Sequence, residues 1–128
     1  MPASKVSVIG GGSFGTVLAN IAAQNGYDVM FWMRSSQVVD DVNRQHQNLQ
    51  YLPGYELNRK VVASADMQAA VADSDIIFVA VPSSSFRQVV QSVAAHAPES
   101  AMLVSTTKGI EPGAFKLMSQ ILGEELPE

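Results

Sequence analysis

Six consecutive residues, Ile76-Ile-Phe-Val-Ala-Val81, are all apolar, and this run constrains the fold more than any other segment of the 128-residue chain. A strand with one face in water alternates apolar and polar residues, whereas a strand covered on both faces reads as continuously apolar. Pro82 ends the run, because proline has no N–H to donate to a sheet. The segment therefore predicts a strand at the centre of a parallel sheet, with helices on both faces.

Shorter apolar runs alternate with segments of helical length along the rest of the chain. Strands are predicted over residues 6–9, 28–33, 61–63, 76–81 and 102–104, and helices over residues 13–25, 36–46, 66–72, 84–96 and 113–122. Strands joined by helices through right-handed crossovers form a doubly wound sheet. We therefore expect one α/β domain over residues 1–128 with a mainly parallel sheet, and ligands bound beyond the carboxyl ends of its strands.

Apolar spacing also predicts which face each helix buries. In the first helix, which Gly26 should end, the predicted core face consists of Val17, Leu18, Ile21 and Ala22. In the fourth helix it consists of Phe86, Val89, Val90 and Val93.

Composition excludes several classes of site. The chain has no cysteine, so it holds no disulfide, zinc ribbon or thiol nucleophile, and His46 and His96 have no metal-ligand spacing around them. Its net charge of −4 leaves no basic face for nucleic acid. The longest apolar run is far short of the ~18 residues of a membrane span, and no leader precedes the first strand, so we expect a soluble, cytoplasmic protein.

Three carboxylates precede the central strand but do not suggest acid–base catalysis. Asp66, Asp73 and Asp75 lie in or beside the short predicted helix that leads into that strand. We expect them in water, at the edge of the sheet opposite the ligand.

A glycine-rich turn follows the first predicted strand and opens the first helix. Its sequence, Gly10-Gly-Gly12-Ser-Phe-Gly15, has the spacing G-x-G-x-x-G. Gly10 permits a tight turn, Gly12 lets the backbone approach a pyrophosphate, and Gly15 lets the helix pack closely on the strand. The N–H groups at the helix start would face the anion. Because the motif lies between a strand and a helix, it favours dinucleotide binding over an ordinary turn.

The residues after the second strand bear on which dinucleotide would bind. An acidic residue that binds a free ribose 2′-OH is expected there, but the chain has Arg34-Ser35-Ser36. A guanidinium and hydroxyls suit a 2′-phosphate, so we expect NADP to be preferred over NAD. The alternative is that Arg34 is simply a solvated residue at a strand end. Trp32 alternates within the strand and is interpreted as a core residue.

Five segments together resemble the NAD(P)-dependent glycerol-3-phosphate dehydrogenases. They are GGGSFGTVLA from Gly10, Phe31-Trp-Met-Arg34, Asn48-Leu-Gln-Tyr-Leu-Pro-Gly54, Val81-Pro-Ser83 with Phe86, and Lys108-Gly-Ile-Glu111. The segments occur in order over nearly the whole chain. The Tyr-Leu-Pro-Gly and Lys-Gly-Ile-Glu segments are more specific than the glycine turn, and they argue against other reductases with a similar domain.

The resemblance implies hydride transfer between NAD(P)H and dihydroxyacetone phosphate, giving sn-glycerol 3-phosphate for phospholipid synthesis. It places Ser13 and Phe14 at the pyrophosphate and Arg34 with Ser35 at the adenosine ribose. The other implied site residues are Tyr51 and Phe86 in the cofactor cleft, Pro82 near the nicotinamide, and Lys108 against cofactor and substrate.

Several of these residues also have purely structural interpretations. Tyr51 stands beside a Pro-Gly turn and could simply pack, and Phe86 falls on the apolar face of its helix. Pro82 could serve only as a strand stop, with Ser84 or Ser85 capping the next helix. Lys108 follows the last predicted strand, where a cation can meet a phosphate, or it is a solvated lysine in a turn.

The resembled enzymes continue beyond the position of Glu128, the last residue of this sequence, into a helical substrate domain that carries their proton-donating lysine. We therefore expect this chain to be a cofactor-binding half that has no catalytic residue of its own and does not turn over substrate alone. It could self-associate through the face that the absent domain would cover. A stand-alone NAD(P)-binding regulatory module, which would be favoured if the natural protein ended at Glu128, is the alternative from a different class.

Overall fold

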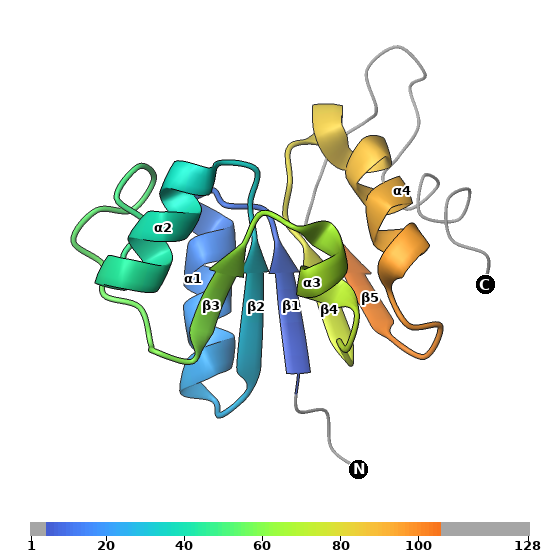
Figure 1. The fold of residues 1–128 in the computed structure, drawn as a ribbon, viewed down its shortest axis with the longest axis horizontal. Helices are drawn as coiled ribbons and strands as arrows, with labels where there is room; N and C mark the ends of the chain where they lie inside the picture. The colour runs from blue at the N-terminus through green and yellow to red at the C-terminus, as the bar shows by residue number, and fades with distance from the viewer. Residues whose placement is uncertain (1–4, 106–128) are drawn as a thin grey trace.

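A computed structural model of the chain describes residues 5–105, which form a sheet flanked by helices (Figure 1). Its elements in chain order are β1 (Lys5–Ile9), α1 (Ser13–Gln24), β2 (Asp28–Trp32), α2 (Ser36–Gln45), β3 (Val61–Ser64), α3 (Met67–Val71), β4 (Ile76–Val79), a 3₁₀ turn (Ser83–Ser85), α4 (Phe86–His96) and β5 (Met102–Ser105). The strands and helices match the sequence prediction to within a few residues. The predicted helix over residues 113–122 and the final residue, Glu128, lie outside the described residues.

All five strands run parallel, in the order β3-β2-β1-β4-β5. The central strand β1 pairs with β2 on one side and with β4 on the other, so that Val8 lies opposite both Phe31 and Phe78. The chain moves outward from β1 to β3 and then returns to place β4 on the other side of β1. The point of reversal between β1 and β4 is where doubly wound sheets bind their ligands. The predicted doubly wound sheet is confirmed.

The central apolar run forms a shorter strand than its sequence predicts. β4 ends at Val79, because its neighbour β1 ends at Ile9, where Gly10 turns the chain away with a φ of +126°. Ala80 makes the last hydrogen bond to that neighbour, donating its N–H to the Ile9 carbonyl at 2.8 Å. Ala80 and the following Val81 thus belong to the loop at the carboxyl edge.

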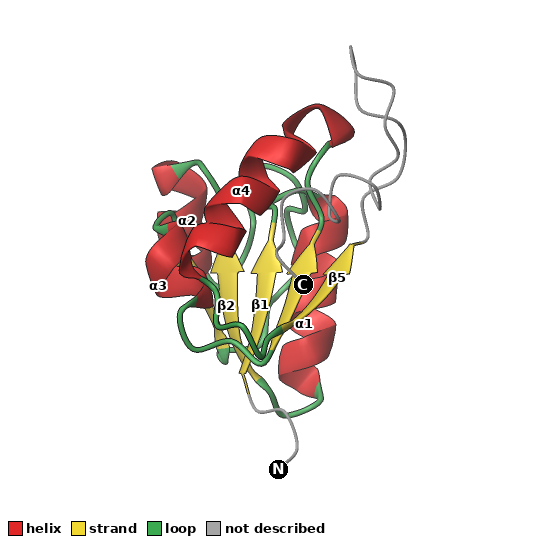
Figure 2. Cartoon of the chain, turned by 90° about the vertical axis from the view of Figure 1, so that its right-hand side faces the viewer, coloured by secondary structure: helices red, strands yellow, loops and turns green. Residues whose placement is uncertain are grey.

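Two apolar cores cover the two faces of the sheet, and Figure 2 shows α1 and α4 on opposite sides of it. The α4 side has the predicted buried face: Phe86, Val89, Val90 and Val93. Ile77 and Val79 of β4 join this core and are fully buried. On the other face Ile76 and Phe78 are only half-buried, so β4 is covered less evenly than its sequence predicts.

The buried face of α1 differs from the predicted one. Its buried residues are Gly15, Thr16, Ala19, Asn20 and Ala23, whereas Ile21 is 47% exposed and Val17, Leu18 and Ala22 are half-buried. The helix lies so close to β1 that a Cβ atom at Gly15 would stand 2.1 Å from the Gly10 carbonyl oxygen. Small residues of α1 therefore face the sheet. Two polar residues, Thr16 and Asn20, form hydrogen bonds with the segment between α2 and β3. Gly26 follows the helix with a φ of +95°, as its predicted stop requires.

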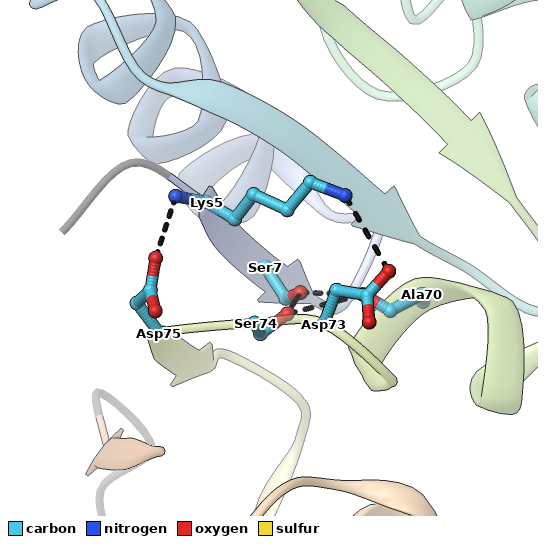
Figure 3. Close-up of polar contacts among 6 residues, drawn as sticks. All are labelled: Lys5, Ser7, Ala70, Asp73, Ser74 and Asp75. Atoms are coloured by element: carbon cyan, nitrogen blue, oxygen red, sulfur yellow. Dashed lines mark hydrogen bonds and ion pairs between the residues drawn. The ribbon is translucent and has the colours of Figure 1, made fainter. Parts of the chain in front are cut away.

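The amino edge of the sheet holds a cluster of paired polar groups (Figure 3). Ser7 is fully buried in β1, and its hydroxyl bonds the Ser74 hydroxyl and the Ala70 carbonyl. The Lys5 N–H donates to the Asp75 carboxylate at 3.0 Å, and the Lys5 ammonium lies 3.6 Å from the carboxylate of Asp73.

The third carboxylate of this group, Asp66, is exposed to water as expected, but its expected place at the amino edge was wrong. Asp66 follows the carboxyl end of β3, and its side chain accepts the Gln68 N–H as the N-cap of α3. It therefore lies at the opposite end of the sheet from Asp73 and Asp75. Its placement follows from chain direction, because a helix that leads into β4 must start beside the end of β3.

Candidate cofactor-binding site

A cavity of about 850 Å³ opens at the carboxyl edge of the sheet, where β1, β2 and β4 end side by side. Loops that follow these three strands build most of its wall. The lining residues are 10–15, 32–35, 38, 51, 80–83 and 85. The size is in the upper part of the range for small-molecule and cofactor sites.

Two glycines of the turn after β1 are required by close backbone approaches. A Cβ atom at Gly10 would lie 2.3 Å from the Ala80 carbonyl oxygen, and the φ of this residue is in the region that side chains disfavour. A Cβ atom at Gly15 would meet the Gly10 carbonyl oxygen, as described above. Gly10 and Gly15 therefore bring β1, the loop after β4 and α1 together at the cavity floor.

Gly12 has a different environment, because a Cβ atom there would have no neighbour within 4 Å. Its φ of −76° is ordinary, so the fold does not require a glycine at this position. Gly12 is also the N-cap of α1, where no side chain caps the helix and no acidic residue occupies the first turn. Free N–H groups and the helix dipole at this end favour an anion.

The electrostatics of the cavity wall also favour an anion. Arg34 is the one charged residue among the described residues that line the cavity, and its side chain is exposed. Beside it, the Ser35 hydroxyl accepts the Val38 N–H at 3.3 Å and caps α2. Arg34 therefore immediately precedes the N-cap of a second helix, at the end of β2 where the family resemblance predicts the adenosine ribose.

The segment between α2 and β3 is tethered to α1 and to the glycine turn. Ser13 donates its hydroxyl to the Tyr51 carbonyl at 3.0 Å. The side chain of Asn48, which is fully buried, donates to the Gly11 carbonyl at 2.8 Å and to the Thr16 hydroxyl at 2.9 Å. Hydrophobic periodicity could not predict these contacts, but the i, i+4 spacing of polar Thr16 and Asn20 on α1 was an available signal.

The remaining predicted residues fall into three groups. Ser13, Phe14, Tyr51 and Pro82 line the cavity, and Phe14 and Tyr51 are 61% and 49% exposed. Phe86 is fully buried in the core beneath α4 and is not part of the wall. Lys108 lies outside the described residues.

Trp32 combines packing with a place in the cavity wall. It joins the α4-side core, as predicted, and its indole N–H donates to the Ala65 carbonyl at 3.1 Å. The same residue lines the cavity.

The helix after Pro82 begins with a 3₁₀ turn and continues as α4. Ser85 occupies the N-cap position of α4, as one interpretation of the sequence predicted, but its side chain makes no capping hydrogen bond.

Strand order, the cavity at the point of reversal and the glycine turn define a Rossmann-like domain. Residues 5–128 match the family described as NAD-dependent glycerol-3-phosphate dehydrogenase N-terminus. The chain belongs to this family.

Relatives and solved structures agree with that assignment. The chain is 50% identical over 122 residues to glycerol-3-phosphate dehydrogenase [NAD(P)+] of Teredinibacter turnerae, covering 95% of this chain and 36% of the relative. It is 48% identical over 126 residues to the protein of the same name from Acinetobacter baylyi, covering 98% and 35%. The crystal structure of glycerol-3-phosphate dehydrogenase from Coxiella burnetii superposes with a TM-score of 0.90 at 28% identity, covering 98% of this chain and 38% of that one. The chain, which reaches Glu128, thus spans about a third of the length of its curated relatives.

Two classes of feature are not found in the described part of the chain. Between residues 5 and 105, no three His, Cys, Asp or Glu side chains gather closely enough to hold a metal ion. None of the helices there combines the length and apolar composition needed to cross a bilayer.

Proposed function

We propose that this chain is the cofactor-binding part of an oxidoreductase that interconverts dihydroxyacetone phosphate and sn-glycerol 3-phosphate with NAD(P)H. The observation that carries the proposal is the open position at Gly12, where the backbone and the uncapped start of α1 border the cavity. A reduced nicotinamide supplies the hydride that converts the ketone to the alcohol. The described residues bind and orient the cofactor.

The glycine turn is proposed to hold the pyrophosphate. Gly12 has no side chain to keep a phosphate from the backbone, and N–H groups of the first turn of α1 have no partner within the helix. The neighbouring side chains of Ser13 and Phe14 are exposed in the same wall. These features together suit a negatively charged pyrophosphate.

Arg34 and Ser35 are proposed to recognise the 2′-phosphate of NADP. The wall has no carboxylate among its described residues that could bind a free 2′-OH in place of that phosphate. A charge-assisted hydrogen bond contributes about 1.5–3 kcal/mol, which corresponds to roughly tenfold or more in affinity. NADP is therefore preferred over NAD.

The remaining residues are proposed to act near the nicotinamide and the substrate. Tyr51 and Pro82 line the cavity, and Pro82 is proposed to lie near the nicotinamide. From the family resemblance, Lys108 is proposed to bind both the cofactor and the substrate. Phe86, the first residue of α4, contributes indirectly by packing this helix into the core. The proton donor belongs to the family's helical domain, beyond the position of Glu128. The 128-residue chain alone therefore does not oxidise NADPH with dihydroxyacetone phosphate, and a steady loss of absorbance of the reduced nicotinamide would contradict this.

Exposed apolar side chains beside the cavity also support self-association of the isolated chain. Phe14, Tyr51 and Leu49 are 61%, 49% and 39% exposed, and apolar side chains that gather into one large exposed patch mark surfaces that bind a partner. Sedimentation velocity at increasing concentration checks this, and a single monomeric species throughout would contradict it.

Titration with NADPH and NADH at one salt concentration tests the cofactor assignment. Trp32 is the single tryptophan and lines the cavity, so its quenching and energy transfer to the reduced nicotinamide report binding, with a Trp32→Phe chain as the optical background. We expect NADPH to bind at least about tenfold tighter than NADH. Equal affinities would refute the role of Arg34, and absence of binding by either cofactor would refute the proposal as a whole.

A further inference from the structure

Asn48 is a fully buried polar residue outside the helices and strands, yet its side chain has a complete set of partners. Its amide nitrogen donates to the Gly11 carbonyl at 2.8 Å and to the Thr16 hydroxyl at 2.9 Å. Its amide oxygen accepts the N–H of Tyr51 at 3.1 Å. One side chain therefore connects the glycine turn, the first turns of α1 and the loop that carries Tyr51.

The contacts of Asn48 reach two successive carbonyl groups of the turn. It binds the Gly11 carbonyl directly, and Thr16, which accepts from Asn48, donates its own hydroxyl to the Gly12 carbonyl at 2.7 Å. The Gly12 carbonyl also accepts the backbone N–H of Thr16 at 3.0 Å, so Asn48 contributes most at Gly11. Met33 packs against Gly11, because a Cβ atom at Gly11 would lie 2.7 Å from Cβ of Met33. Gly11 therefore has little room to move. The orientation of both peptide groups is thus fixed from outside the cavity.

Fixing a carbonyl group also fixes the N–H of the same peptide unit. The Gly11–Gly12 peptide is trans, so its N–H points opposite to the carbonyl that Asn48 holds. Asn48 does not line the cavity, whereas Gly12 does. A reversed peptide would present a carbonyl oxygen, which repels an anion, where the N–H now stands.

We infer that Asn48 is a positioning residue for the cofactor, holding the Gly11 and Gly12 carbonyls back so that the turn presents N–H groups to the pyrophosphate. The inference rests on the proposed function, because it requires that the pyrophosphate bind at this turn. Asn48 does not touch the cofactor and acts through Gly11 and Thr16.

Asn20 provides a matched control for this role. It is also a buried asparagine that tethers the segment between α2 and β3, donating to the Tyr55 hydroxyl at 3.1 Å and accepting the Asn58 N–H at 2.7 Å. Neither partner belongs to the glycine turn. Replacing Asn20 therefore weakens the same tether but leaves the Gly11 and Gly12 peptides held.

The experiment measures binding of NADPH and of adenosine 2′-monophosphate, which lacks the pyrophosphate, by calorimetry on the 128-residue chain. Asn48→Leu should weaken NADPH by about tenfold and adenosine 2′-monophosphate by less than about twofold. Asn20→Leu should change either affinity by less than about twofold, while it lowers the melting temperature to a similar extent. Thr16→Val should weaken NADPH binding by less than Asn48→Leu, because the Gly11 carbonyl and the backbone bond to the Gly12 carbonyl remain held, and Thr16→Ser should restore binding, because the hydroxyl returns.

Three results would overturn the inference: unchanged NADPH affinity in Asn48→Leu, an equal loss for both ligands, or an equal loss in Asn20→Leu. If Asn48→Leu fails to fold, the comparison of Thr16→Val with Thr16→Ser decides. Absence of NADPH and NADH binding by the unmodified chain would instead refute the proposed function, so the two failures are distinguishable.

Discussion

The amino and carboxyl edges of the sheet both carry polar and charged side chains, but the contacts of these side chains differ. At the amino edge, polar groups bind one another: Ser7 bonds Ser74, and two ion pairs join Lys5 to Asp73 and Lys60 to Asp28. At the carboxyl edge, the side chain of Arg34, the free end of α1 and the exposed rings of Phe14 and Tyr51 face a cavity. The polar groups of the amino edge are paired with one another, whereas several of those at the carboxyl edge border the cavity.

This difference separates residues that stabilise the fold from residues that are proposed to bind the cofactor. In a parallel sheet every strand ends at the same edge, so the loops that follow β1, β2 and β4 converge on one place. The opposite edge receives only the connections that enter the strands. Substitutions at the amino edge should therefore change stability without changing affinity, and those at the cavity should do the reverse.

The largest effect on binding is expected from Gly12→Val. The backbone at Gly12 suits any residue and a Cβ atom there has no neighbour within 4 Å, so the free energy of unfolding should fall by no more than about 1 kcal/mol. The side chain would occupy the place proposed for the pyrophosphate and reduce NADPH affinity by about a hundredfold. Calorimetry with NADPH and urea unfolding measure the two quantities. Affinity close to that of the unmodified chain would contradict the assignment.

Arg34→Gln should have the next largest effect, and the effect should depend on the ligand. Loss of the guanidinium should weaken NADPH by about tenfold and leave NADH nearly unchanged, because only NADPH carries the 2′-phosphate. Parallel titrations at one ionic strength check this. A similar loss for both cofactors would mean that Arg34 does not discriminate between them.

Ser7→Ala should affect stability alone. Removal of this fully buried hydroxyl leaves Ser74 with one fewer partner, and we expect the free energy of unfolding to fall by about 1 kcal/mol. Urea unfolding monitored by Trp32 fluorescence gives this value. NADPH affinity should be unchanged, and a parallel loss of affinity would show that the two edges are coupled.

The smallest effect is expected from Lys5→Met. The ion pair with Asp73 spans 3.6 Å between side chains that are 48% and 79% exposed, and pairs of this kind contribute little. The free energy of unfolding should change by less than about 0.5 kcal/mol, and high salt should remove what difference there is. A salt-independent loss of several times that size would contradict this interpretation of the amino edge.

How far the sequence predicts this structure is clearest in α4 and α1. The apolar spacing of Phe86, Val89 and Val93 identified the buried face of α4, because this face packs into one apolar core with β4 and α3. The same reasoning was only partly right for α1, where Leu18 and Ala22 pack against the core but Ile21 is exposed and Thr16 is buried. A helix that begins at a close glycine contact needs small residues beside the strands, and hydrophobicity does not report that requirement.

The sequence predicted the glycine turn and the basic residue of the candidate site. It did not predict the buried side chain of Asn48 that holds the glycine turn in place. Gly10, Gly12 and Arg34 follow strands, so strand prediction alone brought them to one edge. Asn48 could not be placed in this way, since it is neither apolar nor next to a strand, and its partners Gly11 and Thr16 are distant in sequence. Such contacts depend on the path of an irregular segment, which local patterns do not specify.

The central claim is that the carboxyl edge, and not the amino edge, holds the dinucleotide. Backbone amide NMR spectra of the isotopically labelled chain, recorded during addition of NADPH, test it most directly. We expect chemical-shift changes concentrated at the amides of Gly12, Ser13 and Arg34, with those of Lys5, Ser7 and Asp75 nearly unchanged. Saturable NADPH binding that shifts the amino-edge amides and leaves Gly12 and Ser13 unaffected would contradict it.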